Sequence, residues 1–545
     1  MRCPACIQRT RCQPIPQLPV AGLWLERKNG DRCDGLLPLV DQIEYGVTTF
    51  CWVGGGDKML RFFASAGGPG GSCHRREWLR ISTLAGWGML PATTPDSGKR
   101  LPATPRPTGQ DFPGFGRARS VILVYASGGQ SQIDMWDPKP QAPDHIRGAF
   151  STLSTAVPGL AFCEHLPRLS RIADRFAVLR NLSHEDLDHG SATYLALTGR
   201  YHARLSSNPA PSPNDFPTYG AVWNRITKNP RALFEAIHVN GPALVPFTLS
   251  PGQNGGFLGR EYEPVVVGDV SRRSVAIPSL AMRENLSKTR LLQRKTLKES
   301  LNARSAALAR YQGARDVAHL YDRAYDMLLS PQSREAFDLS RERPALRDRY
   351  GRHRSGQACL LARRLVEAGV PLITVIWNHS NRGQDKDPLD TEVYGWDTHN
   401  DIFSALRQHL LPRFDESFSA LLEDLDQRGL LDETLVVCMG EFGRAPQVAL
   451  EPSFLGRTPG RKHWARVYSM VMAGAGVAPG AVLGASDRWG GEPAGDALGP
   501  WDVAATMFAA LGVDPSGHFE DPLGRPFAIS TGRPIHELYA GQVAR

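Results

Sequence analysis

Five short polar runs carry the residues of this sequence that could do chemistry. Each combines carboxylate, imidazole or hydroxyl side chains with glycine, and they span residues 128–137, 184–191, 395–401, 440–444 and 460–464. Carboxylate and imidazole together suit borderline cations such as Zn²⁺, Mn²⁺ or Fe²⁺. Two such ions can clamp the attacking and leaving oxygens of an ester. One run alone is more often a capped turn, so the joint placement of all five predicts a metal-binding, hydrolase-type site.

The elements that must position these runs alternate between strand and helix. Short apolar, β-branched stretches predict strands at 120–125, 176–179, 236–239, 372–376, 435–439 and 468–472, and apolar residues at helical spacing predict helix over 403–428. This alternation predicts an α/β fold with a mostly parallel sheet and helices on both faces. Ligands bind at strand ends in such sheets. The proline-free segment 287–329, rich in Lys, Arg, Leu, Ala and Glu, predicts a helical insertion; a coiled-coil partner surface is the alternative.

Composition places the chain among globular proteins, with 41% hydrophobic and 22% charged residues over 545 positions. The net charge of +8 does not predict a nucleic-acid partner. Residues 1–91 hold 11 Lys/Arg against 7 Asp/Glu, which is +4, and the other basic residues are interleaved with acids. Six of the nine cysteines precede residue 74, and the remaining three are too few for a disulfide framework.

An arginine pair, Arg75 and Arg76, precedes a short apolar run at 81–90 and a proline-rich tail. This layout is typical of a twin-arginine export signal; the alternative is a chance pair before a buried helix. We expect a signal at 73–91, a linker at 92–116, the export machinery as a partner, and a periplasmic or cell-surface location. The apolar run is too short for a stable membrane span. Because such signals lie at N-termini, we expect 1–72 to be an extension, with 1–58 untranslated if synthesis starts at Met59.

Several motifs follow one another in a fixed order along the body of the chain. They are Gly-Gly-Gln-Ser-Gln-Ile-Asp-Met-Trp-Asp at 128–137, Leu-Thr-Gly-Arg at 197–200, Gly-Trp-Asp-Thr-His at 395–399, Gly-Glu-Phe-Gly-Arg at 440–444 and Gly-Arg-Lys-His-Trp at 460–464. Through the four motifs other than Leu-Thr-Gly-Arg, residues 117–540 resemble domain-of-unknown-function family 1501, a relative of sulfatases within the alkaline phosphatase superfamily. Leu-Thr-Gly-Arg is similar to a sulfatase motif of that wider superfamily. The resemblance implies an alkaline phosphatase-like three-layer sandwich. It also implies metal-dependent hydrolysis of phosphate or sulfate esters, on small molecules or polysaccharides.

The resemblance also implies which residues bind the divalent ion, whether Zn, Mn, Fe or Ca. The implied metal ligands are Asp134, Asp397, His399, Glu441 and His463. Two positions depart from the superfamily pattern. Phe442 stands where a histidine is expected, and Asp134 is the nearest acid to an aspartate missing after the first strand.

The implied catalytic residues are His189, Ser191 and Arg444. The superfamily nucleophile lies nine residues before the threonine of Thr-Gly, which is position 189, a histidine here. His189 either attacks directly, forming a phospho-imidazole, or helps hold the ion while water attacks. Ser191 is a second candidate nucleophile, although on a helix it points about 200° away from His189. Two other functions stay open: a non-catalytic metal- or ligand-binding scaffold that kept the fold, and a cell-surface assembly protein.

Overall fold

The computed structural model describes residues 48–53, 59–64, 111–227, 234–245, 247–271, 288–304, 335–381 and 395–539. The chain divides into two compact units, Met1–Pro102 and Ala103–Arg545. In the first unit, β1 (Thr48–Val53) and β2 (Met59–Ala64) form an antiparallel pair. The expected twin-arginine signal at 73–91 and most of the expected linker lie outside the described residues.

An eight-stranded sheet forms the centre of the second unit, in the order β10-β7-β11-β3-β12-β15-β6-β16. Within this sheet, β15 alone runs antiparallel to both of its neighbours, β12 and β6. The strands are β3 (Ser120–Tyr125), β6 (Ala177–Leu182), β7 (Ala236–Val239), β10 (Val265–Val267), β11 (Leu372–Ile376), β12 (Thr434–Met439), β15 (Tyr468–Ala473) and β16 (Val482–Leu483). All six strands expected from the sequence belong to it. The prediction of an α/β fold with a mostly parallel sheet is confirmed.

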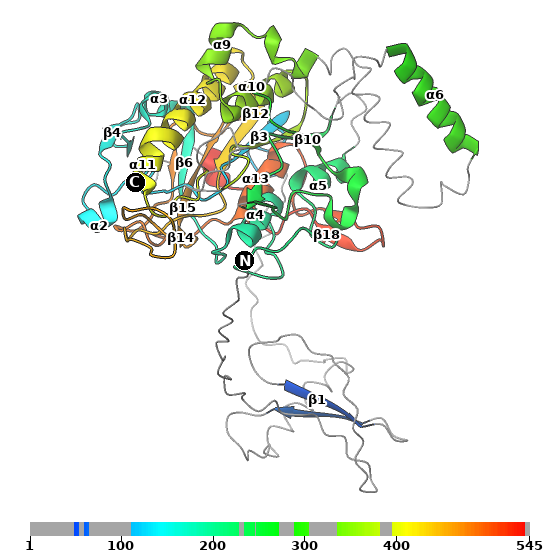
Figure 1. The fold of residues 1–545 in the computed structure, drawn as a ribbon, viewed down its shortest axis with the longest axis horizontal. Helices are drawn as coiled ribbons and strands as arrows, with labels where there is room; N and C mark the ends of the chain where they lie inside the picture. The colour runs from blue at the N-terminus through cyan, green and yellow to red at the C-terminus, as the bar shows by residue number, and fades with distance from the viewer. Residues whose placement is uncertain are drawn as a thin grey trace, which may run out of the picture. The chain divides into compact units, whose positions relative to one another are not determined.

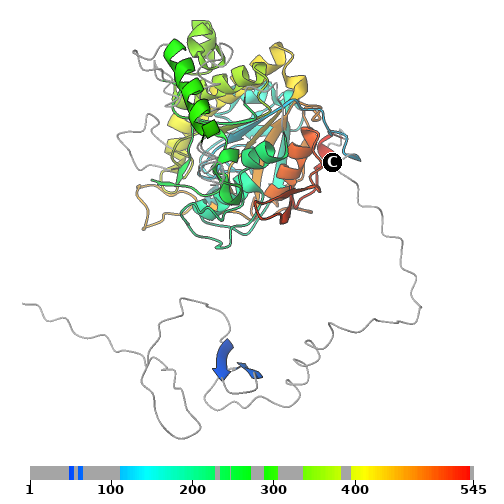
Figure 2. The same cartoon turned by 90° about the vertical axis from the view of Figure 1, so that its right-hand side faces the viewer.

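Helices cover both faces of the sheet and make three layers (Figures 1 and 2). Because β3, β11 and β12 are buried along their whole length, both of their faces are apolar, as in other covered parallel sheets. One apolar core includes side chains of α10 and α12, and the other includes side chains of α4, α5 and α13. These helices are α4 (His189–Thr198), α5 (Tyr219–Ile226), α10 (Arg354–Glu367), α12 (Leu411–Gln427) and α13 (Pro500–Ala510).

Smaller elements surround these layers. They are the helices α2 (Asp144–Arg147), α3 (Pro167–Arg171), α9 (Pro344–Arg349) and α11 (Ile402–Ala405), and the strand pairs β4 (Thr152–Ser154) with β5 (Ala161–Cys163), β8 (Leu244–Val245) with β9 (Thr248–Leu249), β13 (Gly443–Arg444) with β14 (His463–Trp464), and β17 (His518–Glu520) with β18 (Pro526–Ala528). The expected insertion at 287–329 contains α6 (Lys288–Arg304), and its remainder lies outside the described residues. None of the helices described is long and apolar enough to cross a lipid bilayer.

The direction of the strands determines which loops meet. The carboxyl ends of β3, β6, β11 and β12 lie at one edge of the sheet, because these strands run the same way. The antiparallel β15 begins at that same edge, so the residues that precede it meet residues that follow the other strands. Four of the five polar runs follow β3, β6, β11 and β12, and the fifth precedes β15.

Candidate metal centre

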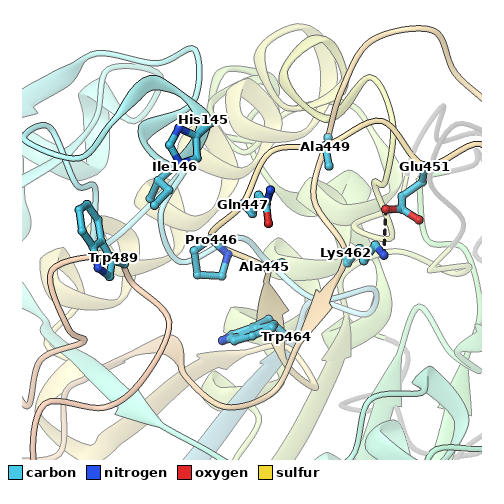
Figure 3. Close-up of a pocket in the computed structure, with 11 residues that line it drawn as sticks. His145, Ile146, Ala445, Pro446, Gln447, Ala449, Glu451, Lys462, Trp464 and Trp489 are labelled. Atoms are coloured by element: carbon cyan, nitrogen blue, oxygen red, sulfur yellow. Dashed lines mark ion pairs between the residues drawn. The ribbon is translucent and has the colours of Figure 1, made fainter.

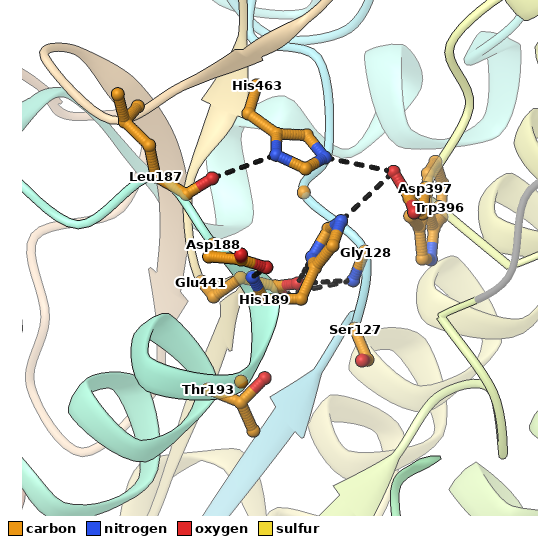
Figure 4. Close-up of polar contacts among 12 residues, drawn as sticks. Ser127, Gly128, Leu187, Asp188, His189, Thr193, Trp396, Asp397, Glu441 and His463 are labelled. Carbon is orange, nitrogen blue, oxygen red and sulfur yellow. Dashed lines mark hydrogen bonds and ion pairs between the residues drawn. The ribbon is translucent and has the colours of Figure 1, made fainter. Parts of the chain in front are cut away.

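Three histidines surround one carboxylate oxygen at this edge. Asp397 Oδ1 lies 3.0 Å from His189 Nε2, 2.9 Å from His399 Nε2 and 3.2 Å from His463 Nε2. The Nε2 atoms of His399 and His463 are 3.1 Å apart. Figure 4 shows His189 and His463 both directed at Asp397. We call these four residues the donor set, because each presents one ligand-type atom to the others.

Local structure fixes the direction of two of the histidines. His189 is the first residue of α4, and its backbone N–H donates to the side chain of the preceding Asp188 at 2.9 Å. His463 lies in β14, directly opposite Arg444 of β13. Side chains opposite each other in an antiparallel pair share one face. His463 and Arg444 therefore both reach Asp397, and Arg444 Nη2 lies 2.9 Å from Asp397 Oδ1.

The outer nitrogens of these two histidines are held by acceptors. His189 Nδ1 lies 2.6 Å from Glu441 Oε1, and His463 Nδ1 lies 2.8 Å from the carbonyl oxygen of Leu187 (Figure 4). A proton held at Nδ1 leaves the lone pair on Nε2, which is the arrangement of metal-ligating histidines. The ring of His399 is instead stacked on Phe454, with centroids 3.7 Å apart and planes 7° from parallel. These acceptors therefore leave Nε2 of His189 and of His463 as the ring nitrogen that faces Asp397 Oδ1.

Glu441 lies behind His189 and is fully buried. Its carboxylate accepts the N–H of Gly128 at 2.8 and 3.1 Å and the hydroxyl of Tyr125 at 2.9 Å. The hydroxyl of Tyr125 also lies 2.7 Å from that of Thr193. Gly128 has a φ of +117°, and a Cβ there would lie 2.3 Å from the backbone nitrogen of Asp397. Only glycine therefore permits this close approach of two loops.

Opposite charges set the protonation of the donor set. Burial raises the pKa of Asp397, but the charge of His189 and hydrogen bonds from the histidines outweigh it and hold that pKa well below its usual range. Burial lowers the pKa of His189, but Asp397 and Glu441 outweigh it and raise that pKa to about 9. Burial and the charge of His189 lower the pKa of His463 to about 4. These shifts favour a charged His189 beside an ionised Asp397 at neutral pH.

Three members of the donor set, His189, Asp397 and His463, offer ligand atoms that all lie within 4.8 Å of one another, as the ligands of one divalent ion do. Ligand atoms of a tetrahedral ion with bonds of about 2.1 Å lie roughly 3.4 Å apart, close to the 2.9–3.2 Å found around Asp397 Oδ1. The side chains of Asp397 and His463 are 19% and 21% exposed, whereas those of His189 and His399 are 6% exposed. The set is therefore open to solvent on the side of Asp397 and His463, as a catalytic ion requires.

Some residues singled out from the sequence lie elsewhere. Asp134 is paired with Arg461, with Nε–Oδ2 at 2.7 Å and Nη2–Oδ1 at 3.1 Å. Ser191 donates its hydroxyl to Asp186 at 2.7 Å and accepts the N–H of Ser207 at 3.1 Å. Neither contacts the donor set, because these partners hold them. The structure does bring together His189, Asp397, His399, His463 and Arg444, with Glu441 one layer behind.

Sequence reasoning missed the residues that support this set. Tyr125 and Gly128 bind Glu441 through a hydroxyl and a backbone N–H, and His184 Nε2 lies 2.5 Å from the carbonyl oxygen of Glu441. The tyrosine that ends an otherwise aliphatic strand and the glycine pair after it are visible signals. Leu187 acts through its carbonyl group, for which side-chain type gives no signal.

No curated protein matches the chain. Similar solved structures include the phosphonate monoester hydrolase SpPMH from Silicibacter pomeroyi, with 13% identity over 78% of this chain and 77% of that one and a TM-score of 0.34. The PsFucS1 sulfatase from Pseudoalteromonas sp. has 14% identity over 73% and 68%, with a TM-score of 0.29. The alkaline phosphatase from the Antarctic bacterium TAB5 has 13% identity over 66% and 92%, with a TM-score of 0.30.

A family model, unlike the solved structures, assigns the chain to a family. The model described as "Protein of unknown function (DUF1501)" matches residues 118–539. This range contains all five polar runs and every strand of the central sheet. The chain therefore belongs to the DUF1501 family, and the resemblance seen in its motifs is confirmed.

Proposed function

We propose that this protein is a metal-dependent hydrolase of phosphate or sulfate esters. The observation that supports it best is the convergence of three imidazole nitrogens on Asp397 Oδ1, open to solvent on one side. His189, Asp397, His399 and His463 would hold the ion. An imidazole-rich set favours Zn, Mn or Fe over Ca, which prefers oxygen ligands. Such an ion polarises an ester oxygen and lowers the pKa of water. The ester class itself comes from the motif resemblance.

The surrounding residues would orient this set and complement an anionic substrate. Glu441 holds the His189 ring through Nδ1, which leaves Nε2 directed at the ion position. This orientation supports His189 as a ligand, with water as the nucleophile, over direct attack by its imidazole. The fully buried Arg444 sits against Asp397 and would place positive charge beside the ester oxygens.

A non-catalytic metal-binding protein is the second candidate. It is favoured by Ser191, whose hydroxyl is bound to Asp186 and not to the donor set. A single experiment separates the two candidates. Elemental analysis of the purified full chain is run beside a screen of 4-nitrophenyl phosphate, 4-nitrophenyl sulfate and phenyl phosphonate esters. The His399→Ala variant serves as the control.

The hydrolase proposal expects a stoichiometric ion, and ester turnover that falls together with metal content in His399→Ala. A bound ion without turnover on any ester would support the second candidate. A folded protein with no transition metal after growth in metal-supplemented medium would contradict both.

We also propose that the protein is exported through the twin-arginine machinery to the periplasm or cell surface, on the strength of Arg75 and Arg76. The test is fractionation of a bacterial host that expresses the chain from Met59, with the double variant Arg75→Lys and Arg76→Lys as the comparison. Export of the parent chain and retention of the double variant are expected. Equal export of the two would contradict the proposal.

A further inference from the structure

A cavity of about 510 Å³ is lined in part by Trp464 of β14 and by Ala445 and Lys462, which flank the β13–β14 pair. Side chains alternate between the two faces of a strand. His463 and Arg444 face Asp397. The adjoining residues Lys462, Trp464 and Ala445 line the cavity. The cavity therefore lies on the other face of the β13–β14 pair, away from the donor set.

Two tryptophans, Trp464 and Trp489, form the apolar part of its wall on either side of Pro446 (Figure 3). The indole N–H of Trp464 donates to the carbonyl of Gly491 at 2.7 Å, which fixes the ring. The guanidinium of Arg488 lies 4.5 Å from the ring centroid of Trp489 and covers one of its faces. Both indoles are half-buried. Each ring is thus held in place by internal contacts while part of its surface lines the cavity.

Side chains with hydrogen-bonding groups line another part of the wall, beside the apolar Ile146, Ala445 and Ala449. Lys462 Nζ and Glu451 Oε1 form an ion pair at 3.0 Å, across the cavity from Trp489 in Figure 3. Gln447 and His145 also line the cavity, and both side chains are exposed. The ion pair cancels its own charge, so this wall offers donors and acceptors without a strong field of either sign.

We propose that this cavity is a carbohydrate-binding site, separate from the metal centre. The C–H groups on one face of a sugar ring pack against the negatively charged face of an indole. Its hydroxyl groups are then left for side chains such as Gln447, Glu451 and Lys462. A purely apolar ligand would leave the hydrogen-bonding groups of Gln447, Glu451 and Lys462 without partners from the ligand, whereas a sugar contacts both kinds of wall. The inference does not depend on ester hydrolysis, because none of its residues belongs to the donor set.

Binding is tested with the full chain on an array of defined neutral, uronic-acid and sulfated oligosaccharides. The best-bound oligosaccharide is then titrated by tryptophan fluorescence. Trp489→Ala is expected to weaken binding by about tenfold or more, since a buried aromatic anchor dominates such contacts. Gln447→Ala, which alters only an exposed side chain, is expected to weaken it by several-fold. Trp501→Ala is the matched control, because Trp501 is also half-buried but lies on α13, outside the cavity.

Two further measurements make the outcome decisive. Stripping the metal with a chelator is expected to leave sugar binding unchanged, so failure of the hydrolase proposal is distinguishable from failure of this one. An apolar dye, 8-anilinonaphthalene-1-sulfonate, is titrated with and without the sugar. The proposal is overturned if no oligosaccharide binds, if Trp489→Ala and Gln447→Ala bind as the parent chain does, or if only the dye occupies the cavity.

Discussion

Two aspartates in this protein each lie against a fully buried arginine, yet their remaining contacts differ. Arg461 takes both oxygens of Asp134, whose side chain is 1% exposed, and Ser131 adds a third hydrogen bond at 2.5 Å. Arg444 reaches only Oδ1 of Asp397. Three histidines contact the same oxygen, and the Asp397 side chain is 19% exposed. A carboxylate bound by a forked guanidinium keeps few lone pairs for an ion. Asp134 is thus tied into the interior by Arg461, whereas Asp397 presents its Oδ1 to three histidines.

The largest expected effect on stability is that of Asp134→Ala. It should lower the free energy of unfolding by about 3–5 kcal/mol, because it leaves the Arg461 guanidinium buried without its counter-ion. Guanidinium chloride unfolding of the full chain measures this, and metal content per folded molecule should not change. Loss of the ion with unaltered unfolding would reverse the roles of the two aspartates.

The substitution expected to lower metal affinity most is Asp397→Ala. Metal affinity should fall by more than about 100-fold, because supporting residues alone account for roughly 10–100-fold in such sites. Competition with a chromophoric chelator measures the affinity. Asp432→Ala, at an exposed position, is the control and should bind as the parent does. Equal affinities in the two variants would remove Asp397 from the donor set.

Glu441→Gln keeps the shape of the side chain but removes its charge. The variant should lower the metal affinity by about 10–100-fold, since the carboxylate orients His189 and increases the basicity of its ring. The same chelator competition applies. An unchanged affinity would mean that the hydrogen bond to Nδ1 positions His189 without tuning it.

Metal affinity should depend on pH through His189. Its pKa is raised to about 9, above the ordinary value of about 6.5, so a proton must leave before the ion binds. Affinity should therefore rise by about tenfold per pH unit between roughly 7 and 9 and level off above that. In the metal-free protein the sign is opposite. The stability from protonated His189 is fully present below pH 6.5 and is lost as pH rises through about 9. His189→Ala should abolish the pH dependence of stability, and a flat affinity profile in the parent would contradict this assignment.

The smallest effect is expected for Ser191→Ala. Its hydroxyl supports only Asp186 and Ser207, so ester turnover and metal content should be retained, with a stability loss of about 1 kcal/mol. His189→Ala should lose the ion. Equal activity of the two variants with metal retained in both would rule out a covalent role for either residue.

The six longest strands of the sheet were predictable because each is an apolar run, as at Ser120–Tyr125 and Leu372–Ile376. Two edge strands, β10 (Val265–Val267) and β16 (Val482–Leu483), are too short for such a pattern to show. The order of the strands and the reversal of β15 could not be predicted either. Both depend on which edges pair across long stretches of chain.

Most of the residues that meet at Asp397 could be predicted from the sequence, but which residues contact Asp397 and which support them from behind could not. The motifs that contain Asp397, His399 and His463 placed these residues together through a family resemblance. Nothing near Asp134 in the sequence shows that Arg461, 327 positions later, takes its carboxylate. Likewise, only the fold places Glu441 behind His189 and not beside His399. Pairings of this kind are set by packing between distant segments.

The position of β3 in the sheet has a consequence for the growing chain. β3 lies between β11 and β12, so both of its neighbours are synthesised more than 240 residues after it. Until Leu372–Ile376 and Thr434–Met439 leave the ribosome, a strand that is wholly buried in the native fold has neither of its edge partners. Contacts of such long sequence separation form slowly, and unpaired apolar strands aggregate. The nascent protein should therefore be a strong client of ribosome-associated chaperones.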